Sequence, residues 1–251
     1  MSDQLSGSDH RHGGSAAANP SDGQPIIVFD LDGTLADTAP DLIAALNATL
    51  EADGLPPLVM DRAKRFLGSG TRAMVERAFR EVGADDGSRD VQDKRFQRFL
   101  DLYGQNLKRE TQLYPGVVNT LDNLRVQGWM LAVCTNKATD HAIRLLDLLG
   151  IGDRFAAICG FDSFPYHKPD PRHLTLTIAQ AGGNPKRALM VGDSRTDIAT
   201  ARAASLPVVA TSFGYSDVPV ANLTPDRLIH DFQELIDIAD AVTDSILHYR
   251  D

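Results

Sequence analysis

The stretch Pro25-Ile-Ile-Val-Phe-Asp-Leu-Asp-Gly-Thr34 is a short apolar run that ends in two carboxylates and a glycine. An unbroken apolar run between turn residues is typical of a strand that is buried on both faces of a parallel sheet. In open parallel sheets, ligands bind beyond the carboxyl ends of the strands. We therefore expect Asp30, Asp32 and the residues that follow them to lie at a binding site.

The remainder of the chain falls into a helical part and an alternating part. Residues 41–109 show apolar positions at helical spacing and no strand pattern. From residue 114 onward, helices alternate with predicted strands at 129–134, 156–159, 188–191 and 207–210. This alternation predicts an α/β fold with a doubly wound parallel sheet. We expect residues 25–37 and 114–251 to form this Rossmann-like core, and residues 38–113 to form a small all-α cap domain inserted after the first strand.

Composition and charge argue against a nucleic-acid-binding or membrane protein. The chain has 251 residues, of which 43% are hydrophobic and 24% are charged, as in ordinary globular proteins. Its formal net charge of -9 opposes binding to the phosphate backbone of nucleic acids. No apolar run approaches the roughly 18 residues that cross a bilayer. We expect a disordered tail over residues 1–24 and a cytoplasmic protein, monomer or homodimer, with neither nucleic-acid nor membrane partners.

Four carboxylates come at the ends of predicted strands. Asp30 and Asp32 follow the first strand, and Asp193 and Asp197 follow the strand at 188–191. Carboxylates that converge at one sheet edge repel each other strongly unless a cation lies among them or some are protonated. Oxygen ligands without a nearby His or Cys suit Mg²⁺ best, and Mg²⁺ usually shares its coordination with a substrate phosphate. The sequence therefore predicts a magnesium site.

Neighbouring residues carry groups that bind phosphate. Thr34 and Thr135 supply hydroxyls, and Gly33 allows backbone amides to approach a ligand closely. Lys168 supplies a compact positive charge for phosphoryl oxygens. Each of these residues alone is common in turns, helix starts or surface loops. Their joint placement, in this order and near strand ends, indicates phosphate chemistry.

Four short motifs resemble those of the haloacid dehalogenase (HAD) superfamily of phosphatases. They are Asp30-Leu-Asp-Gly-Thr-Leu-Ala-Asp-Thr38, Thr135-Asn-Lys137, Lys168-Pro169 and Gly192-Asp-Ser-Arg-Thr-Asp197. The match spans about residues 26–235. The helical insert after the first motif resembles a small cap domain, and the overall layout is similar to the phosphoglycolate phosphatases.

The resemblance implies a role for each residue. Asp30 is expected to attack phosphorus and form an aspartyl phosphate, while Asp32 acts first as acid and then as base. The carboxylates of Asp30 and Asp193 and the backbone carbonyl of Asp32 would hold Mg²⁺, and Asp197 would order its waters. The groups expected to bind phosphoryl oxygens are Thr135, Asn136 and Lys168. The implied reaction is Mg²⁺-dependent hydrolysis of a small phosphorylated metabolite, with 2-phosphoglycolate as the leading substrate.

The segment Gly68-Ser-Gly-Thr-Arg-Ala73 fits the Gly-x-Gly-x-x-Ala form of a dinucleotide-binding loop. The residues before it, 62–67, read as helix rather than strand, so we expect no nucleotide there. The segment resembles instead the glycine-containing cap loop that closes over the active site in capped phosphatases. Arg72 is then a candidate to bind a substrate carboxylate, or else an exposed residue at a helix start.

Three further residues stay outside the predicted site. Lys137 follows the second motif, and it either binds phosphate or begins the next helix. His167 and His173 flank Lys168 and invite acid-base chemistry, but loop histidines are often incidental and Asp32 already fills that role.

Several other functions use similar residues. A phosphomutase similar to β-phosphoglucomutase shares the nucleophile, the acid and the cap but transfers the phosphoryl group to a sugar, and the motifs leave it open. Hydrolysis of a sugar phosphate or pyrophosphate is open as well. A signalling receiver domain also combines Asp, Thr, Lys and Mg²⁺ on a parallel sheet, but its small size and lack of a helical insert oppose it. Asp32 disfavours the dehalogenases, which attack carbon and need neither this acid nor a metal.

Overall fold

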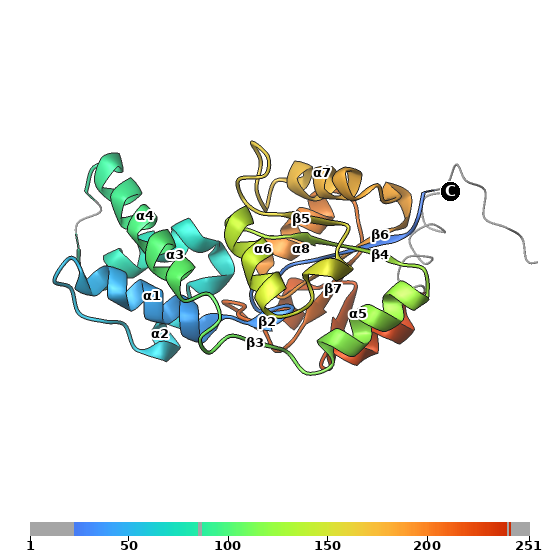
Figure 1. The fold of residues 1–251 in the computed structure, drawn as a ribbon, viewed down its shortest axis with the longest axis horizontal. Coiled ribbons are helices and arrows are strands. Elements are labelled where there is room, and N and C mark those ends of the chain that lie inside the picture. The colour runs from blue at the N-terminus through green and yellow to red at the C-terminus, as the bar shows by residue number, and fades with distance from the viewer. Residues whose placement is uncertain (1–22, 85–86, 240, 242–251) are drawn as a thin grey trace, which may run out of the picture.

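A six-stranded parallel sheet forms the core of the molecule (Figure 1). The computed structural model describes residues 23–84, 87–239 and 241. The strands lie in the spatial order β5 (Ala157–Cys159), β4 (Met130–Cys134), β1 (Ile26–Phe29), β6 (Ala188–Gly192), β7 (Val208–Thr211) and β8 (Arg227–Ile229). Every neighbouring pair is parallel. The predicted apolar run of the first strand thus lies at the centre of the sheet.

Strand β1 explains why helices cover both faces of the sheet. All four of its residues are fully buried. Its first and third residues pack in a cluster with α7 (Pro171–Ala181) and α8 (Arg195–Ala203). Its second and fourth residues pack in another cluster with α5 (Val117–Val126) and α6 (Thr139–Leu148). Because successive side chains of a strand point to opposite faces, each face needs its own helical layer, and the predicted doubly wound α/β fold is confirmed.

Four helices form a lobe that follows β1 in the chain. They are α1 (Ala39–Glu51), α2 (Met60–Lys64), α3 (Thr71–Glu81) and α4 (Arg89–Gln105). Figure 1 shows this lobe, the cap, beside the edge of the sheet at which the strands end. Side chains such as Leu46, Phe79 and Phe99 are buried between the helices. A helical cap therefore occupies the place predicted for it.

The chain enters and leaves the cap through two short antiparallel strands, β2 (Ala36–Asp37) and β3 (Gln112–Leu113). Beside them, the buried carboxylate of Asp41 in the first turn of α1 accepts hydrogen bonds from the backbone amides of residues 109–111 and from the Thr111 hydroxyl. The Asp41 carboxylate therefore links α1, where the chain enters the cap, to residues 109–111, where the chain leaves it. The sequence predicted neither of these two-residue strands, which are too short for a periodic pattern, nor β8, whose first residue, Arg227, is charged and exposed.

The predicted tail of residues 1–24 lies outside the described residues, except for Gly23 and Gln24. The Gln24 side-chain amide donates to the Gly128 carbonyl, and the Gln24 carbonyl accepts from the Asn184 amide, each at 2.9 Å. Gln24 is therefore hydrogen-bonded to the core, and it belongs to the core rather than to the predicted tail. Within the described ranges, no helix is both long enough and apolar enough to cross a membrane.

Candidate active site

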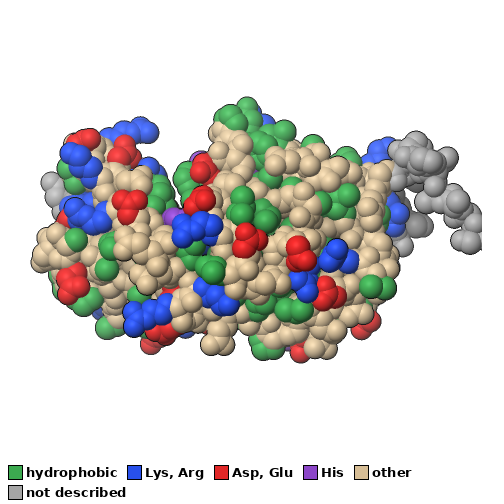
Figure 2. Space-filling model, viewed as in Figure 1, with side chains coloured by type: hydrophobic (Ala, Val, Ile, Leu, Met, Phe, Trp, Pro, Cys, Tyr) green, Lys and Arg blue, Asp and Glu red, His purple; other side chains and the backbone are tan. Residues whose placement is uncertain are grey.

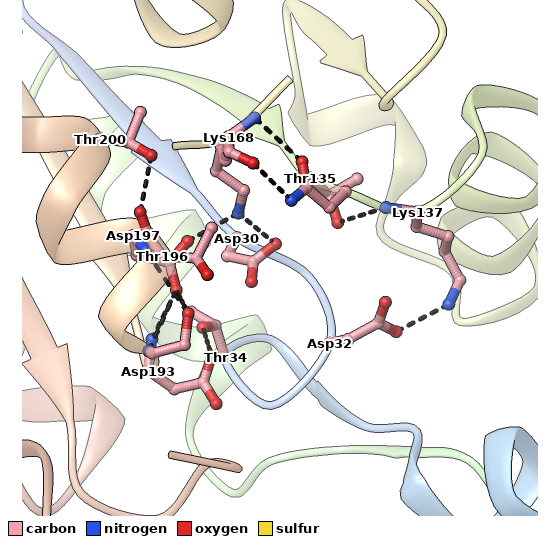
Figure 3. Close-up of polar contacts among 12 residues, drawn as sticks. Asp30, Asp32, Thr34, Thr135, Lys137, Lys168, Asp193, Thr196, Asp197 and Thr200 are labelled. Atoms are coloured by element: carbon pink, nitrogen blue, oxygen red, sulfur yellow. Dashed lines mark hydrogen bonds and ion pairs between the residues drawn. The ribbon is translucent and has the colours of Figure 1, made fainter. Parts of the chain in front are cut away.

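The carboxyl ends of β1, β4 and β6 meet at one edge of the sheet, and the predicted site residues gather there (Figure 3). Asp30, Thr135 and Asp193 directly follow these three strands, and Lys168 reaches the same point from the loop between β5 and α7. A cavity of about 40 Å³ lies over this edge. Its core side is lined by predicted site residues together with Lys137, Ser194 and Thr196. Its cap side includes Leu42, Gly68, Gly70, Thr71 and Met74. The cavity therefore lies between core and cap.

A buried cluster of ion pairs forms the floor of the site. The Lys168 Nζ lies 2.9 Å from Asp30 Oδ1 and 2.6 Å from Asp197 Oδ1, and its side chain is only 2% exposed. Asp30, Asp193 and Asp197 each offer a carboxylate oxygen, and these three oxygens lie within 4.8 Å of one another. Three carboxylates thus share one ammonium group, which leaves an excess of negative charge when all are ionised.

Burial changes the proton affinity of this cluster. Burial, opposed by Lys168 and reinforced by the charge of Asp197, raises the pKa of Asp30 to about 6. Burial and repulsion by Asp197 and Asp30 raise the pKa of Asp193 well above its usual value. Burial alone would lower the pKa of Lys168, but attraction by Asp197 and Asp30 outweighs it and the pKa is raised. The site therefore favours additional positive charge, either protons or a metal cation.

Asp193 is held in place by neutral donors. Its Oδ1 accepts from the Thr34 hydroxyl at 3.2 Å, and its Oδ2 accepts from the Tyr215 backbone amide at 2.6 Å. Gly33 and Gly214 approach it so closely that a Cβ on Gly33 would lie 2.4 Å from Asp193 Oδ2, and one on Gly214 would lie 2.2 Å from Asp193 Cβ. The sequence suggested Gly33 and Thr34 as phosphate-binding residues. In the structure, the Thr34 hydroxyl donates to the Asp193 carboxylate and Gly33 packs against it.

The donor set of this cluster fits Mg²⁺, which prefers carboxylate and carbonyl oxygens and retains several waters. Asp197 is already engaged, because its Oδ1 binds Lys168 and its Oδ2 accepts from the Ser194 hydroxyl at 2.6 Å. Asp30 and Asp193 are thus the carboxylates best placed to bind the ion directly. The Asp32 side chain points away from the cluster and toward Lys137 (Figure 3), so its carboxylate is not among the groups that could hold the ion.

Asn136 holds the loop that contains Lys168. Its side-chain oxygen accepts from the Lys168 amide at 3.0 Å, and its side-chain nitrogen donates to the Lys168 carbonyl at 2.9 Å. Asn136 therefore positions Lys168, whereas the sequence suggested that it contacts phosphate. Thr135 is almost fully buried and lines the cavity, and its hydroxyl oxygen accepts from the Lys137 amide at 3.2 Å. The hydroxyl hydrogen of Thr135 remains available to a phosphoryl oxygen.

Lys137, which the sequence prediction left out, is part of the site. Its Nζ lies 2.7 Å from Asp32 Oδ1, and its side chain is only 2% exposed and lines the cavity. Burial lowers its pKa, but the Asp32 carboxylate outweighs this and the pKa is raised above its usual value. Its place directly after Thr135 and Asn136 at a strand end was the available signal. That signal was ambiguous because a lysine at the start of a helix is common on protein surfaces.

The cap loop over residues 67–71 covers the cavity, as its resemblance to capped phosphatases implied. The Thr196 hydroxyl donates to the Gly68 carbonyl at 3.0 Å, and the Thr71 hydroxyl donates to the Asn136 carbonyl at 3.3 Å. Gly70 has a φ of +88°, and a Cβ there would lie 3.3 Å from the Asn136 side-chain nitrogen. The cap is therefore hydrogen-bonded to the core at the mouth of the site.

Arg72 is not brought into this cavity. Its guanidinium binds Asp93 at 2.7 Å and lies 4.2 Å from the centre of the Phe96 ring, which places both partners on α4. Its side chain is 47% exposed and lines a wider, neighbouring cavity that shares Gly70, Thr71, Asn136 and Lys168 with the first. The hypothesis that Arg72 binds a substrate carboxylate thus finds no support in its contacts.

The two histidines beside Lys168 have different surroundings. His173 lies in α7, fully buried, and its ring is roughly perpendicular to that of Phe164. Burial, together with the charge of Lys168, lowers its pKa to about 4, so His173 is neutral at physiological pH. Among the described residues that line the 40 Å³ cavity, neither His167 nor His173 is present.

The sequence model of the family described as haloacid dehalogenase-like hydrolase matches residues 27–211. The chain belongs to this family. It is 48% identical over 214 residues to the phosphoglycolate phosphatase of Mesorhizobium japonicum, covering 84% of this chain and 93% of that protein. It is 45% identical over 211 residues to the phosphoglycolate phosphatase of Agrobacterium fabrum, covering 84% and 90% respectively. The fold of this HAD-like hydrolase is also similar to a crystal structure described as a predicted phosphoglycolate phosphatase from Haemophilus somnus 129pt. The TM-score is 0.78 at 34% identity, and the match covers 86% of this chain and 97% of that one.

The comparisons bear on two predictions made from the motifs. The predicted family and the predicted enzyme class, a hydrolase that resembles phosphoglycolate phosphatase, are confirmed. The family match also includes the segments that contain Asp30, Thr135, Lys168 and Asp193.

Proposed function

We propose that this HAD-like hydrolase catalyses the Mg²⁺-dependent hydrolysis of a small phosphomonoester, with 2-phosphoglycolate as its leading substrate. The observation that carries the proposal is the position of Asp30, whose carboxylate lies on the cavity floor beside Lys168. A carboxylate held there is placed to attack a phosphoryl group whose oxygens are neutralised by the ammonium. The names of the curated relatives support the choice of substrate.

The first step transfers the phosphoryl group to the enzyme. An Asp30 oxygen attacks phosphorus, and the bond between phosphorus and the leaving-group oxygen breaks as an aspartyl phosphate forms. Asp32 donates a proton to that leaving oxygen, so that an alcohol rather than an alkoxide departs. Lys168 and the Thr135 hydroxyl bind phosphoryl oxygens during this step. When bound by Asp30 and Asp193, Mg²⁺ would supply further positive charge against the same oxygens.

The second step restores the enzyme. Water attacks phosphorus, the bond between phosphorus and the Asp30 oxygen breaks, and inorganic phosphate is released. Asp32, now a carboxylate, accepts a proton from the attacking water. The cap limits access of bulk water until this stage, since its loop is hydrogen-bonded to the core over the cavity.

The proposal is tested by measuring phosphate release from 2-phosphoglycolate beside sugar phosphates, nucleotides and pyrophosphate, each with Mg²⁺ or with EDTA. We expect fast release from 2-phosphoglycolate that EDTA abolishes and that the Asp30→Asn variant lacks. A preference for another ester would keep the reaction and reject the substrate. Absence of release from every ester, together with isomerisation of glucose 1-phosphate, would reject hydrolysis in favour of phosphoryl transfer to a sugar.

A further inference from the structure

The carboxylate of Asp32 is oriented by a buried lysine. Figure 3 shows that Asp32 points away from Asp30 and toward Lys137, which follows β4. The two side chains are 2.7 Å apart at Asp32 Oδ1, and Lys137 is almost completely buried whereas Asp32 is 20% exposed. Of the two carboxylate oxygens, Oδ1 is thus occupied by the ammonium. The other oxygen is the one left to exchange a proton at the cavity.

The same ammonium group contacts the cap. Lys137 Nζ lies 4.5 Å from the centre of the Tyr103 ring, and Tyr103 belongs to the cap helix α4. The ring is fully buried, stacks on Phe99 at 5.9 Å and meets the ring of His141 at 5.6 Å, edge to face. An aromatic face attracts a cation most strongly where water is excluded. Lys137 is therefore held between an acid of the core and an aromatic ring of the cap.

We propose that Lys137 is a positioning residue that aims the acid-base group Asp32, and that the cap holds Lys137 in place through Tyr103. This inference rests on the proposed function, because it assigns Lys137 to the proton transfer of that reaction. With Lys137 on Oδ1, the proton of Asp32 resides on Oδ2 and passes from there to the leaving-group oxygen.

The inference is tested with three phosphate esters that differ in charge and leaving group. 2-Phosphoglycolate and ethyl phosphate both release an alkoxide that needs a proton, but only the first carries a carboxylate. p-Nitrophenyl phosphate releases a phenolate that departs without one. The measured quantity is kcat/KM, because it covers the steps up to release of the leaving group.

The central variant is Lys137→Met, which keeps the length of the side chain and removes its charge. A positioned general acid contributes roughly 10²- to 10⁴-fold, so we expect kcat/KM to fall about 100-fold for both alkyl esters. For p-nitrophenyl phosphate we expect a change of less than about threefold, since no proton is required. Lys94→Met serves as the control for net charge, because Lys94 is 75% exposed on the cap. It should leave all three values unchanged.

Three outcomes would overturn the inference. A loss confined to 2-phosphoglycolate and expressed in KM would make Lys137 a ligand of the substrate carboxylate. An equal loss for all three esters would make it a structural residue. Unchanged values for all three would leave it without a role in the reaction. Because Lys137 is buried, Lys137→Gln is measured in parallel; its amide can still donate to Asp32, so it should lose less than Lys137→Met while showing the same dependence on leaving group.

The contribution of the cap is tested at Tyr103. Tyr103→Phe keeps the aromatic face and should change kcat/KM less than about twofold, whereas Tyr103→Leu removes it and should lower the values for both alkyl esters by about five- to tenfold. Equal kcat/KM values for the two variants would show that the position of Lys137 does not depend on the Tyr103 ring of the cap. If the wild-type enzyme hydrolyses none of the esters, the proposed function itself fails. That result is distinct from every outcome above, each of which requires wild-type activity.

Discussion

Binding of Mg²⁺ to this site should depend on pH through Asp30. Burial raises the pKa of Asp30 to about 6, so this carboxyl is mostly ionised at pH 7.5 and mostly protonated at pH 5. A proton on a ligand must leave before the metal binds, and the apparent affinity therefore falls as pH drops through 6. For one group with this pKa, the affinity for Mg²⁺ should be about 11-fold weaker at pH 5 than at pH 7.5. Asp193 has a raised pKa as well, which makes the fall steeper.

Titration calorimetry with Mg²⁺ at the two pH values measures this effect, and repeating it in buffers of different ionisation enthalpy counts the protons released. The Asp30→Asn variant is the control, because it keeps the shape of the side chain but has no proton to lose. This variant should bind Mg²⁺ more weakly. Its Mg²⁺ affinity should also depend less on pH, because binding releases about one proton fewer than in the wild type. Equal wild-type affinity at pH 5 and pH 7.5, or the same slope in both proteins, would refute the reasoning. The free energy of unfolding of the metal-free protein should change with pH in the opposite direction. Because the pKa of Asp30 is higher in the folded than in the unfolded chain, folding takes up a proton, and the metal-free protein should become more stable as pH falls through 6.

Other expectations follow from single contacts. Gly33→Ala places a Cβ 2.4 Å from Asp193 Oδ2 at a φ of +83°, and should weaken Mg²⁺ binding by about tenfold or more; Gly54→Ala, with a φ of +71° and open space around it, is the matched control in the same titration. Asp41→Ala leaves the buried amide and hydroxyl of Thr111, and the part-buried amide of Arg109, without their acceptor, and should lower the free energy of unfolding by about 3 to 5 kcal/mol in urea titrations. Because burial lowers the pKa of His173 to about 4, its contribution to stability is present above pH 6.5 and is lost as pH falls toward 4. Wild-type unfolding free energy should therefore contain a loss of about 2 kcal/mol between pH 7.5 and pH 5 that His173→Leu lacks, and equal losses in both proteins would contradict this assignment.

The central strands and the residues at their ends were predictable because their physical signal is strong. Strand β1 is buried on both faces, so its four residues are all apolar, and a carboxylate directly after such a run stands out. β8 shows the opposite case: its first residue, Arg227, is exposed and the strand has only three residues. The edge strand β5 has three residues as well, but all of them are apolar and it was predicted at 156–159. The charged and exposed first residue of β8, rather than its length, is what hid it.

The direction in which a charged side chain points was the part that sequence reasoning could not supply. Arg72 and Lys137 both looked like basic residues near helix starts, and Arg72 was preferred because it lies in a glycine-containing loop. In the structure, Arg72 turns to Asp93 on the neighbouring cap helix, whereas Lys137 turns into the cavity and meets Asp32. Each choice is decided by a partner more than 20 residues away in the chain, which no local pattern contains.

The carboxylate cluster of Asp30, Asp193 and Asp197 and the cap junction are linked by one residue, Tyr215. Its backbone amide donates to Asp193 Oδ2, while its hydroxyl donates to Asp37 and accepts from the Ala39 amide at the start of α1. A carboxylate of the cluster is thus joined, through a single residue, to the strand and helix by which the chain enters the cap. Lys137 joins the acid Asp32 to the cap in a similar way through Tyr103. The carboxylates of the proposed reaction come from the strand ends. Their orientation depends on the loop after β7, which contains Tyr215, and on the cap helix α4, which contains Tyr103. The proposed site is therefore complete only when core and cap are packed together.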